Sequence, residues 1–146
     1  MTNDFDPFNR FREIATWFET LTPSSLSQIE RIYAADATFC DPFNELKGIG
    51  KVMAVYDHMF LNLNEPRFVI HQTISQDRHA VMMWTFNFVW RNRAQKIVGC
   101  THFEIDQSGL ITMHRDYWDA AQELYEKIPL LGFLMRWLRR RLAIQQ

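Results

Sequence analysis

The chain has 146 residues and a mass of 17.5 kDa, which fits one compact domain, since most domains contain roughly 100–150 residues. With 47% hydrophobic and 23% charged residues and only five glycines and five prolines, the composition excludes a disordered, collagen-like or low-complexity chain. Aromatic residues reach 14%, which predicts either a bulky core or an apolar cavity walled by rings. Two cysteines cannot form a disulfide framework, so the sequence favours a reducing compartment.

The net charge of −1 is unevenly distributed along the chain. Residues 127–146 contain five basic side chains and no acidic one, whereas the preceding residues carry an excess of six negative charges. An acidic body argues against a nucleic-acid partner, because such domains usually present a basic face. The N-terminus lacks the basic start of a signal peptide, and no apolar stretch approaches the roughly 18 residues of a membrane-spanning helix. The sequence therefore predicts a soluble, cytoplasmic protein.

Helical signals come first along the chain. Asp6-Pro7 is a typical helix start, and apolar residues recur at helical spacing from Phe8 to Leu21. Capping boxes that begin at Ser25 and Ser27 predict a short second helix, whose buried face includes Leu26, Ile29, Ile32 and Tyr33.

A brief extended segment, residues 37–41, separates this second helix from a third one. Gly48 and Gly50 precede a run of apolar residues at helical spacing from Val52 to Leu63, which predicts the clearest helix of the chain. We expect Pro66 to end it.

After Pro66 the hydrophobic period changes to two residues, which is typical of strands. The expected strands cover residues 67–74, 81–90, 97–105 and 110–118, with a hairpin turn at 106–109. Asp119 begins another helix, and residues 129–146 form a basic amphipathic one after Pro129. Helices followed by antiparallel strands predict a single α+β domain, residues 1–146, with helices packed on one face of a curved sheet.

The string Tyr-Ala-Ala-Asp-Ala-Thr-Phe-Cys-Asp-Pro at residues 33–42, followed by Gly48 and a helix that carries Tyr56, resembles the steroid Δ5-isomerases. These enzymes belong to the nuclear-transport-factor-2-like, or SnoaL-like, superfamily, and the resemblance in element order extends to about Trp118. It implies a cone-shaped domain, in which a strongly curved, mostly antiparallel sheet wraps around N-terminal helices and encloses an apolar pocket. It also implies a homodimer formed through the outer sheet face.

The resemblance assigns the proton-shuttling base of the isomerases to Asp41. A carboxylate at the wall of an apolar cavity is poorly solvated, which makes it a usable base. Phe39, on the same face of the strand, would supply such surroundings. The alternative is that Asp41-Pro42 caps a turn.

Two positions differ from the isomerase pattern. Those enzymes stabilise an enolate oxygen with a Tyr on the first helix and a protonated Asp on a late strand, and the corresponding residues here are Trp17 and Thr101. An indole N–H and a hydroxyl do not form the strong, matched donor pair that an enolate needs, so we do not expect steroid isomerase activity.

Alternation along the last strands predicts which side chains face the interior. His114, Asp116 and Trp118 share the inward face, and Asp41, His114 and Asp116 are therefore the candidate catalytic residues, able to move protons together. A hydrogen-bonded structural pair is the alternative for His114 and Asp116. Arg115 alternates away from Asp116, unlike the Asp-Arg-Asp set that the resemblance implies for related epoxide hydrolases.

The candidate ligand-binding residues share an expected place on the inner wall, where rings and hydroxyls would line a pocket. They are Trp17, Phe39, Tyr56, Trp84, Phe86, Phe88, Thr101, Phe103 and Trp118.

Two functions remain open from these observations. The first is a cofactor-free enzyme that moves a proton on a small apolar substrate, as an isomerase, dehydratase or cyclase does. The second is a non-catalytic module that binds an apolar ligand or dimerises. We expect no metal, since the other histidines lack ligand spacing, and no cofactor. We expect the helix at 129–146 to pack against the domain, with membrane-surface contact as the alternative.

Overall fold

A computed structural model describes residues 6–123, 134, 137–138 and 140–141 of the chain. The amphipathic helix expected at 129–146 therefore lies outside the described residues, apart from isolated positions. Within the described part of the chain, no helix has the length and apolar character needed to cross a membrane.

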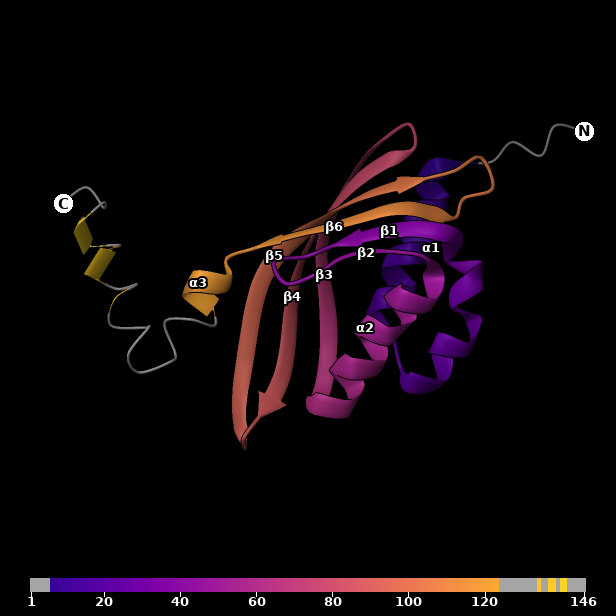
Figure 1. Ribbon diagram of the computed structural model, residues 1–146. Coiled ribbons are helices and arrows are strands. Elements are labelled where there is room, and N and C mark those ends of the chain that lie inside the picture. Colours follow the sequence, from indigo (N-terminus) through magenta and orange to yellow (C-terminus); the bar gives the residue numbers. More distant parts are fainter. Residues whose placement is uncertain (1–5, 124–133, 135–136, 139, 142–146) are drawn as a thin grey trace, which may run out of the picture.

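Helices precede most of the strands, as the sequence predicts (Figure 1). The helical elements are α1 (Pro7–Glu19), the 3₁₀ helix η1 (Pro23–Arg31), α2 (Ile49–Asn62) and the short α3 (Ala120–Glu123). The strands are β1 (Tyr33–Cys40), β2 (Glu45–Lys47), β3 (Asn64–Gln76), β4 (His79–Trp90), β5 (Arg93–Ile105) and β6 (Ile111–Trp118).

The strands form one six-stranded sheet in the order β2-β1-β6-β5-β4-β3. All neighbouring strands are antiparallel except β1 and β6, which pair in parallel. The sheet is curved and does not close into a barrel, and α1, η1 and α2 cover its concave face (Figure 1). The predicted α+β class and the cone-shaped arrangement are confirmed.

The first helix begins where its sequence predicts. The Asp6 carboxylate accepts a hydrogen bond from the Phe8 backbone N–H at 3.0 Å, and Pro7 occupies the first turn, where an amide hydrogen would have no partner. Phe11, Ile14 and Phe18 are the buried residues of this helix, so its apolar face packs on the sheet.

Two expectations for the next segment are wrong. The second helix begins at Pro23, because Thr22 and Ser25 form the capping box, and it is a 3₁₀ helix rather than one started by Ser25 or Ser27. Tyr33 is the first residue of β1 and not part of the helix, because it pairs in parallel with Ile111 of β6. The short strand β2 is an addition that the sequence pattern does not indicate.

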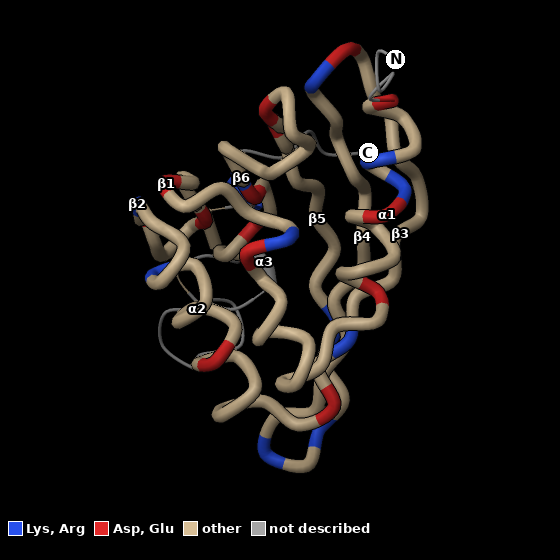
Figure 2. The backbone as a smooth tube through the Cα atoms, turned by 90° about the vertical axis from the view of Figure 1, so that its right-hand side faces the viewer, with Lys and Arg blue, Asp and Glu red and all other residues tan. Residues whose placement is uncertain are grey.

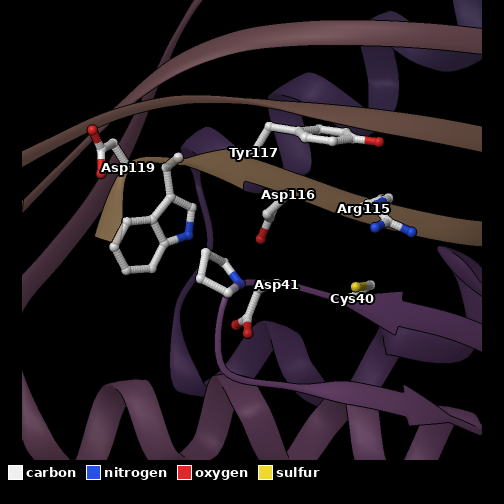
Figure 3. Close-up of a pocket in the computed structure, with 8 residues that line it drawn as sticks. Cys40, Asp41, Arg115, Asp116, Tyr117 and Asp119 are labelled. Carbon is white, nitrogen blue, oxygen red and sulfur yellow. The ribbon is translucent and has the colours of Figure 1, made fainter. Parts of the chain in front are cut away.

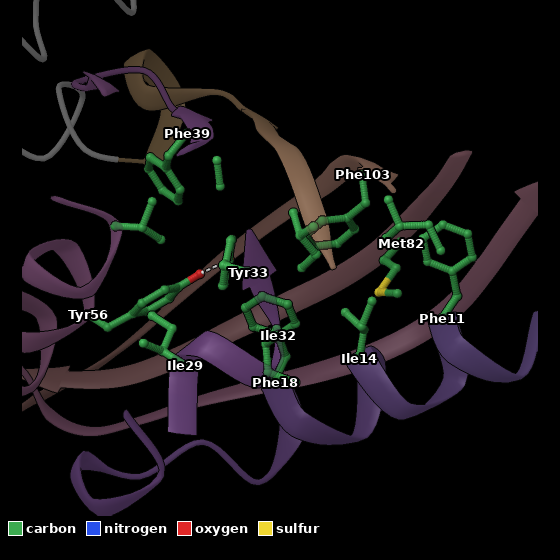
Figure 4. Close-up of a cluster of buried hydrophobic side chains, with 14 of the residues drawn as sticks. Phe11, Ile14, Phe18, Ile29, Ile32, Tyr33, Phe39, Tyr56, Met82 and Phe103 are labelled. Atoms are coloured by element: carbon green, nitrogen blue, oxygen red, sulfur yellow. Dashed lines mark hydrogen bonds between the residues drawn. The ribbon is translucent and has the colours of Figure 1, made fainter. Parts of the chain in front are cut away.

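Large side chains fill the space between the helices and the sheet (Figure 4). Phe11, Ile14 and Phe18 of α1 pack with Met82 and Phe103, and all five are buried. Burying a side chain of this size contributes roughly 1.5–3 kcal/mol relative to leaving it exposed. Three residues that the sequence assigns to a ligand-binding wall, Phe39, Tyr56 and Phe103, belong to this core. Trp84, Phe86 and Thr101 are also at most 8% exposed.

Charged residues lie mainly in turns, at strand ends and on the outer sides of the helices (Figure 2). Lys and Arg are interspersed with Asp and Glu across the described part of the chain. The turn between β3 and β4, for example, carries Asp77 beside Arg78.

Candidate active site

His114 and Asp116 lie on the same inward face of β6, because residues two apart in a strand point to the same side of the sheet. Nε2 of His114 lies 2.8 Å from Oδ1 of Asp116. The His114 side chain is only 4% exposed, whereas that of Asp116 is 16% exposed. The pair therefore has a buried member and a member that reaches solvent.

Thr101 fixes the same carboxylate oxygen from the neighbouring strand. It lies directly opposite Asp116 in the register of β5 and β6, and its hydroxyl donates to Oδ1 of Asp116 at 2.5 Å. The indole N–H of Trp84 donates in turn to the Thr101 hydroxyl oxygen at 2.8 Å. Oδ1 thus receives two hydrogen bonds, while no described residue donates to Oδ2.

Two buried tyrosines extend this network into the core. The Tyr33 hydroxyl lies 2.7 Å from Nδ1 of His114, and the Tyr56 hydroxyl lies 2.7 Å from that of Tyr33 (Figure 4). Burial raises the pKa of both hydroxyls well above the ordinary value of 10, and the negative charge of Asp116 raises both further. Both tyrosines therefore keep their protons at neutral pH.

Aromatic rings surround His114 on its remaining sides. The Phe39, Phe103 and Phe18 rings lie 4.5, 4.8 and 5.9 Å from the imidazole, measured between ring centroids. Because both ring nitrogens have partners and the ring is enclosed, His114 reaches a ligand only through Asp116.

A pocket of about 510 Å³ lies beside Asp116, where the ends of β1 and β6 meet. Its lining residues come from these two strands and the segments that follow them: Cys40, Asp41, Pro42, Arg115, Asp116, Tyr117, Trp118 and Asp119. Figure 3 shows the Asp116 side chain directed from β6 toward Asp41, with Tyr117 on the opposite side of the strand. Asp116 is thus the member of the hydrogen-bonded network that a ligand in this pocket would meet.

Asp41 lines the same pocket, but its hydrogen bonds go to the turn between β1 and β2. Its Oδ1 accepts the backbone N–H groups of Phe43 and Asn44 at 2.7 and 2.6 Å, and the Asn44 side-chain amide lies 3.1 Å from both carboxylate oxygens. The turn-cap alternative for Asp41 is therefore realised. The structure brings Asp41 and Asp116 to one pocket without a direct bond between them, and a catalytic role for Asp41 stays a prediction.

Of the predicted ligand-binding residues, Trp118 alone is among those that line this pocket. It makes an edge contact with Phe43, with ring centroids 5.4 Å apart. Trp17 and Phe88 are half-buried elsewhere, Trp17 against Tyr56, and the indole N–H of Trp17 is buried without an acceptor among the described residues.

Gly99 sits between two tryptophans of the site. It pairs with Trp84 on one side and Trp118 on the other, and a Cβ at this position would lie 2.7 Å from the Trp84 ring and 2.9 Å from the Cβ of Trp118. Glycine therefore permits the close packing that supports the Trp84–Thr101 hydrogen bond.

The sequence did not indicate Tyr33 as a member of the site, and it indicated Tyr56, Trp84 and Thr101 as ligand-binding residues rather than as members of a hydrogen-bonded network. The cross-strand alignment of Trp84, Thr101 and Asp116 was within reach, because all three alternate inward on adjacent strands. Tyr33 had no comparable signal, because its contact with His114 depends on pairing between segments 81 positions apart. Within the described segments, no three His, Cys, Asp or Glu side chains are grouped so that they could hold a metal ion.

Comparison with known proteins agrees with this architecture. The sequence profile of the SnoaL-like domain matches residues 14–114, which is more than half of the chain. No curated protein matches the chain by sequence.

Solved structures of similar shape share little sequence with this chain. A nuclear-transport-factor-2-like protein of unknown function from Burkholderia pseudomallei is 18% identical with a TM-score of 0.68, over 80% of this chain and 92% of its own. An LEH-like epoxide hydrolase of M. tuberculosis is 17% identical with a TM-score of 0.68, over 91% of this chain and 97% of its own. A protein with a ketosteroid isomerase-like fold from Catenulispora acidiphila, in complex with trimethylamine, is 14% identical with a TM-score of 0.66, over 79% and 88% of the two chains. At these identities the likeness establishes the fold alone.

Proposed function

The chain belongs to the SnoaL-like domain family, and from that premise we propose that it is a cofactor-free enzyme in which Asp116 moves a proton on a small, largely apolar ligand. One observation carries the proposal. Oδ1 of Asp116 is fixed by Thr101 and His114, while Oδ2 belongs to a carboxylate that lines a pocket. A carboxylate that is held in place through one oxygen at the wall of a pocket is the arrangement of a general base.

The proposed step is a proton transfer from the ligand to Oδ2. An O–H or activated C–H bond of the ligand breaks, its electron pair remains on the ligand, and the proton forms a bond with Oδ2. Return of the proton to another ligand atom would complete an isomerisation. A dehydration would be completed when a hydroxyl group leaves the ligand with its bonding electrons and takes the proton from Oδ2, which releases water and restores the carboxylate.

The hydrogen bonds of Asp116 suit both halves of this cycle. Oδ1 is an acceptor in the carboxylate, and it remains one as the carbonyl oxygen when Oδ2 carries the proton. Thr101 and His114 therefore keep their bonds in both states, and little reorganisation accompanies the transfer.

The residues that line the pocket support the proposal that the ligand is largely apolar and carries an acidic hydrogen. Trp118 and Pro42 supply apolar wall, and Asp41 lies across from Asp116. Thr101 gives its only hydrogen to Asp116, so it has none left for an enolate oxygen. This supports a substrate other than a steroid enone.

The second candidate is a non-catalytic module that binds a ligand or dimerises. The packed interior favours it, because residues expected to line a deep cavity are instead buried in the core.

Deuterium exchange distinguishes the two. Small cyclic and aryl ketones with exchangeable α-hydrogens are incubated with the protein in D₂O, and the incorporation of deuterium into the ketone is followed by mass spectrometry. We expect the protein to accelerate exchange of at least one ketone, and Asp116→Asn to reduce the rate by about 10²–10⁴-fold, the usual contribution of a general base. Glu104→Gln is the matched control, because Glu104 lies on the opposite face of the sheet. Equal exchange by the Asp116→Asn protein would reject Asp116 as the base.

A further inference from the structure

The hydrogen bonds that link Asp116 through His114 and Tyr33 to Tyr56 have one direction of donation in which every hydrogen has an acceptor. An ionised carboxylate has no hydrogen to give, so the hydrogen in the 2.8 Å contact belongs to Nε2 of His114. A neutral imidazole carries one N–H, so Nδ1 is then an acceptor and the Tyr33 hydroxyl donates to it over 2.7 Å. The Tyr33 oxygen in turn accepts the hydroxyl hydrogen of Tyr56.

The opposite direction leaves one hydrogen unpaired. With a hydrogen on Nδ1, Tyr33 would accept from His114 and donate to Tyr56, and the Tyr56 hydrogen would find no acceptor among the described residues. Tyr56 is buried, and a buried donor without an acceptor is unfavourable. Burial also raises the pKa of both tyrosines, so neither relieves the conflict by losing its proton.

We propose that Tyr33 is a positioning residue that holds His114 in the Nε2–H tautomer, and thereby keeps a proton captured by Asp116 on Oδ2, the oxygen that neither Thr101 nor His114 contacts. The inference rests on the proposed function, because it concerns where the transferred proton resides. In the other tautomer, Nε2 would be an acceptor beside Oδ1. The captured proton would then bridge Oδ1 and Nε2, where a ligand could not recover it.

The carboxylate itself also favours Nε2–H, so the contribution of Tyr33 is measured after the carboxylate is removed. In Asp116→Ala, Nε2 of His114 has lost its carboxylate partner and can bond to water from the pocket. Because water both donates and accepts hydrogen bonds, it favours neither tautomer. Side-chain ¹⁵N spectra of ¹⁵N-histidine-labelled protein report the tautomer. The same spectra distinguish a neutral ring from a protonated one, so the tautomers are compared at an alkaline pH at which the spectra show a neutral ring. Loss of the signal in His114→Gln assigns it.

We expect Asp116→Ala to retain at least a tenfold excess of the Nε2–H tautomer. The double variant Asp116→Ala/Tyr56→Phe is the matched control and should retain it too, because Tyr33 can still donate to Nδ1. In Asp116→Ala/Tyr33→Phe we expect the excess of the Nε2–H tautomer to be several times smaller, because the Tyr33 hydroxyl no longer donates to Nδ1.

Two results would overturn the inference. One is a mixture of tautomers already present in Asp116→Ala or in its Tyr56→Phe derivative, and this result decides the question even if the Tyr33→Phe derivative does not fold. The other is an undiminished excess of Nε2–H after Tyr33→Phe. The proposed function is rejected by a different result, namely deuterium exchange of the ketone that survives Asp116→Asn. Because the tautomer measurement needs no ligand, failure of the inference and failure of the proposed function can be told apart.

Discussion

Asp41 and Asp116 are two carboxylates in one pocket, and their hydrogen-bond donors differ. Asp116 receives side-chain donors from the sheet, whereas Asp41 receives backbone N–H groups of its own turn. A carboxylate whose oxygen accepts neighbouring backbone amides stabilises a local turn. These donors support the proposal that Asp116, rather than Asp41 of the Asp-Pro string, is the base.

Substitution of Asp41 should separate turn formation from charge. Asp41→Asn keeps an oxygen for the Phe43 and Asn44 amides, so we expect the free energy of unfolding to change by less than about 0.5 kcal/mol. Asp41→Ala removes both bonds and should lower that free energy by about 1–2 kcal/mol. Urea unfolding measures both variants, and an Asp41→Ala protein as stable as the original would contradict the turn role.

Tyr33 and Tyr56 predict a loss of stability at alkaline pH. Burial raises the pKa of both hydroxyls in the folded protein, whereas in the unfolded chain they lose their protons near pH 10. Above that pH the unfolded state binds fewer protons than the folded state, so the free energy of unfolding falls as pH rises. Each group contributes up to about 1.4 kcal/mol per pH unit.

The contribution of one hydroxyl is measured with Tyr56→Phe. Urea unfolding of both proteins between about pH 8 and pH 11 should give a shallower alkaline decline for the variant, because one titrating group is absent. Parallel declines would show that the Tyr56 hydroxyl ionises equally easily in the folded and unfolded states.

At the scale of elements, one arginine ties α1 to the rest of the fold. Nε of Arg10 donates to the Gly109 carbonyl oxygen at 2.7 Å, and Nη2 donates to the Arg31 carbonyl oxygen at 2.6 Å. These carbonyls belong to the turn between β5 and β6 and to the end of η1. Nη1 pairs with the exposed carboxylate of Glu13 at 2.8 Å. The guanidinium thus connects three segments of the chain.

Arg10→Lys should destabilise the protein although it keeps the charge. An ammonium cannot reproduce the geometry of a guanidinium that reaches two carbonyls, and the loss should be about 1.5–3 kcal/mol in thermal or urea unfolding. Glu13→Gln is the control, with almost no expected effect, because the Glu13 side chain is 66% exposed and exposed ion pairs contribute little. A lysine variant of unchanged stability would show that the two carbonyl bonds are dispensable.

At the scale of the whole molecule, the outer face of the sheet carries large exposed apolar side chains. They lie on four neighbouring strands: Ile74, Met83, Val98 and Tyr117. Cys100 pairs with Met83 on one side and Tyr117 on the other, so these three side chains lie in one row across the outer face, and Val98 lies two residues from Cys100 on β5. Several large apolar side chains exposed on one face of the sheet support the proposal that two copies of the chain pair through this face.

Val98→Glu tests that proposal. Val98 is 53% exposed, so a glutamate there is tolerated by the single chain but would be buried in a dimer. Sedimentation should show the original protein at twice the chain mass and the variant at the mass of one chain. Leu61→Glu, at a residue of α2 that is 84% exposed, should leave the dimer unchanged. An original protein that sediments as a single chain would reject the proposed dimer.

The resemblance carried by residues 33–42 predicted the shape of the molecule more closely than the details of its interior. The cone-shaped arrangement is confirmed, yet rings expected around a deep cavity, such as Phe39 and Phe103, are in the core. Alternation identifies the face on which a ring lies but not whether opposing side chains leave space. That depends on the volumes contributed by α1, α2 and the sheet together.

The sequence by itself determined the α+β class, the start of α1 and the inward faces of β4, β5 and β6, because capping and periodicity act between residues close along the chain. It also placed His114 and Asp116 on one face. Only the tertiary structure decided that Tyr33 meets His114 and that Asp116 alone of that pair opens to a pocket. The physical reason is that parallel pairing of β1 with β6 joins distant segments, and such pairing leaves no periodic trace in either one.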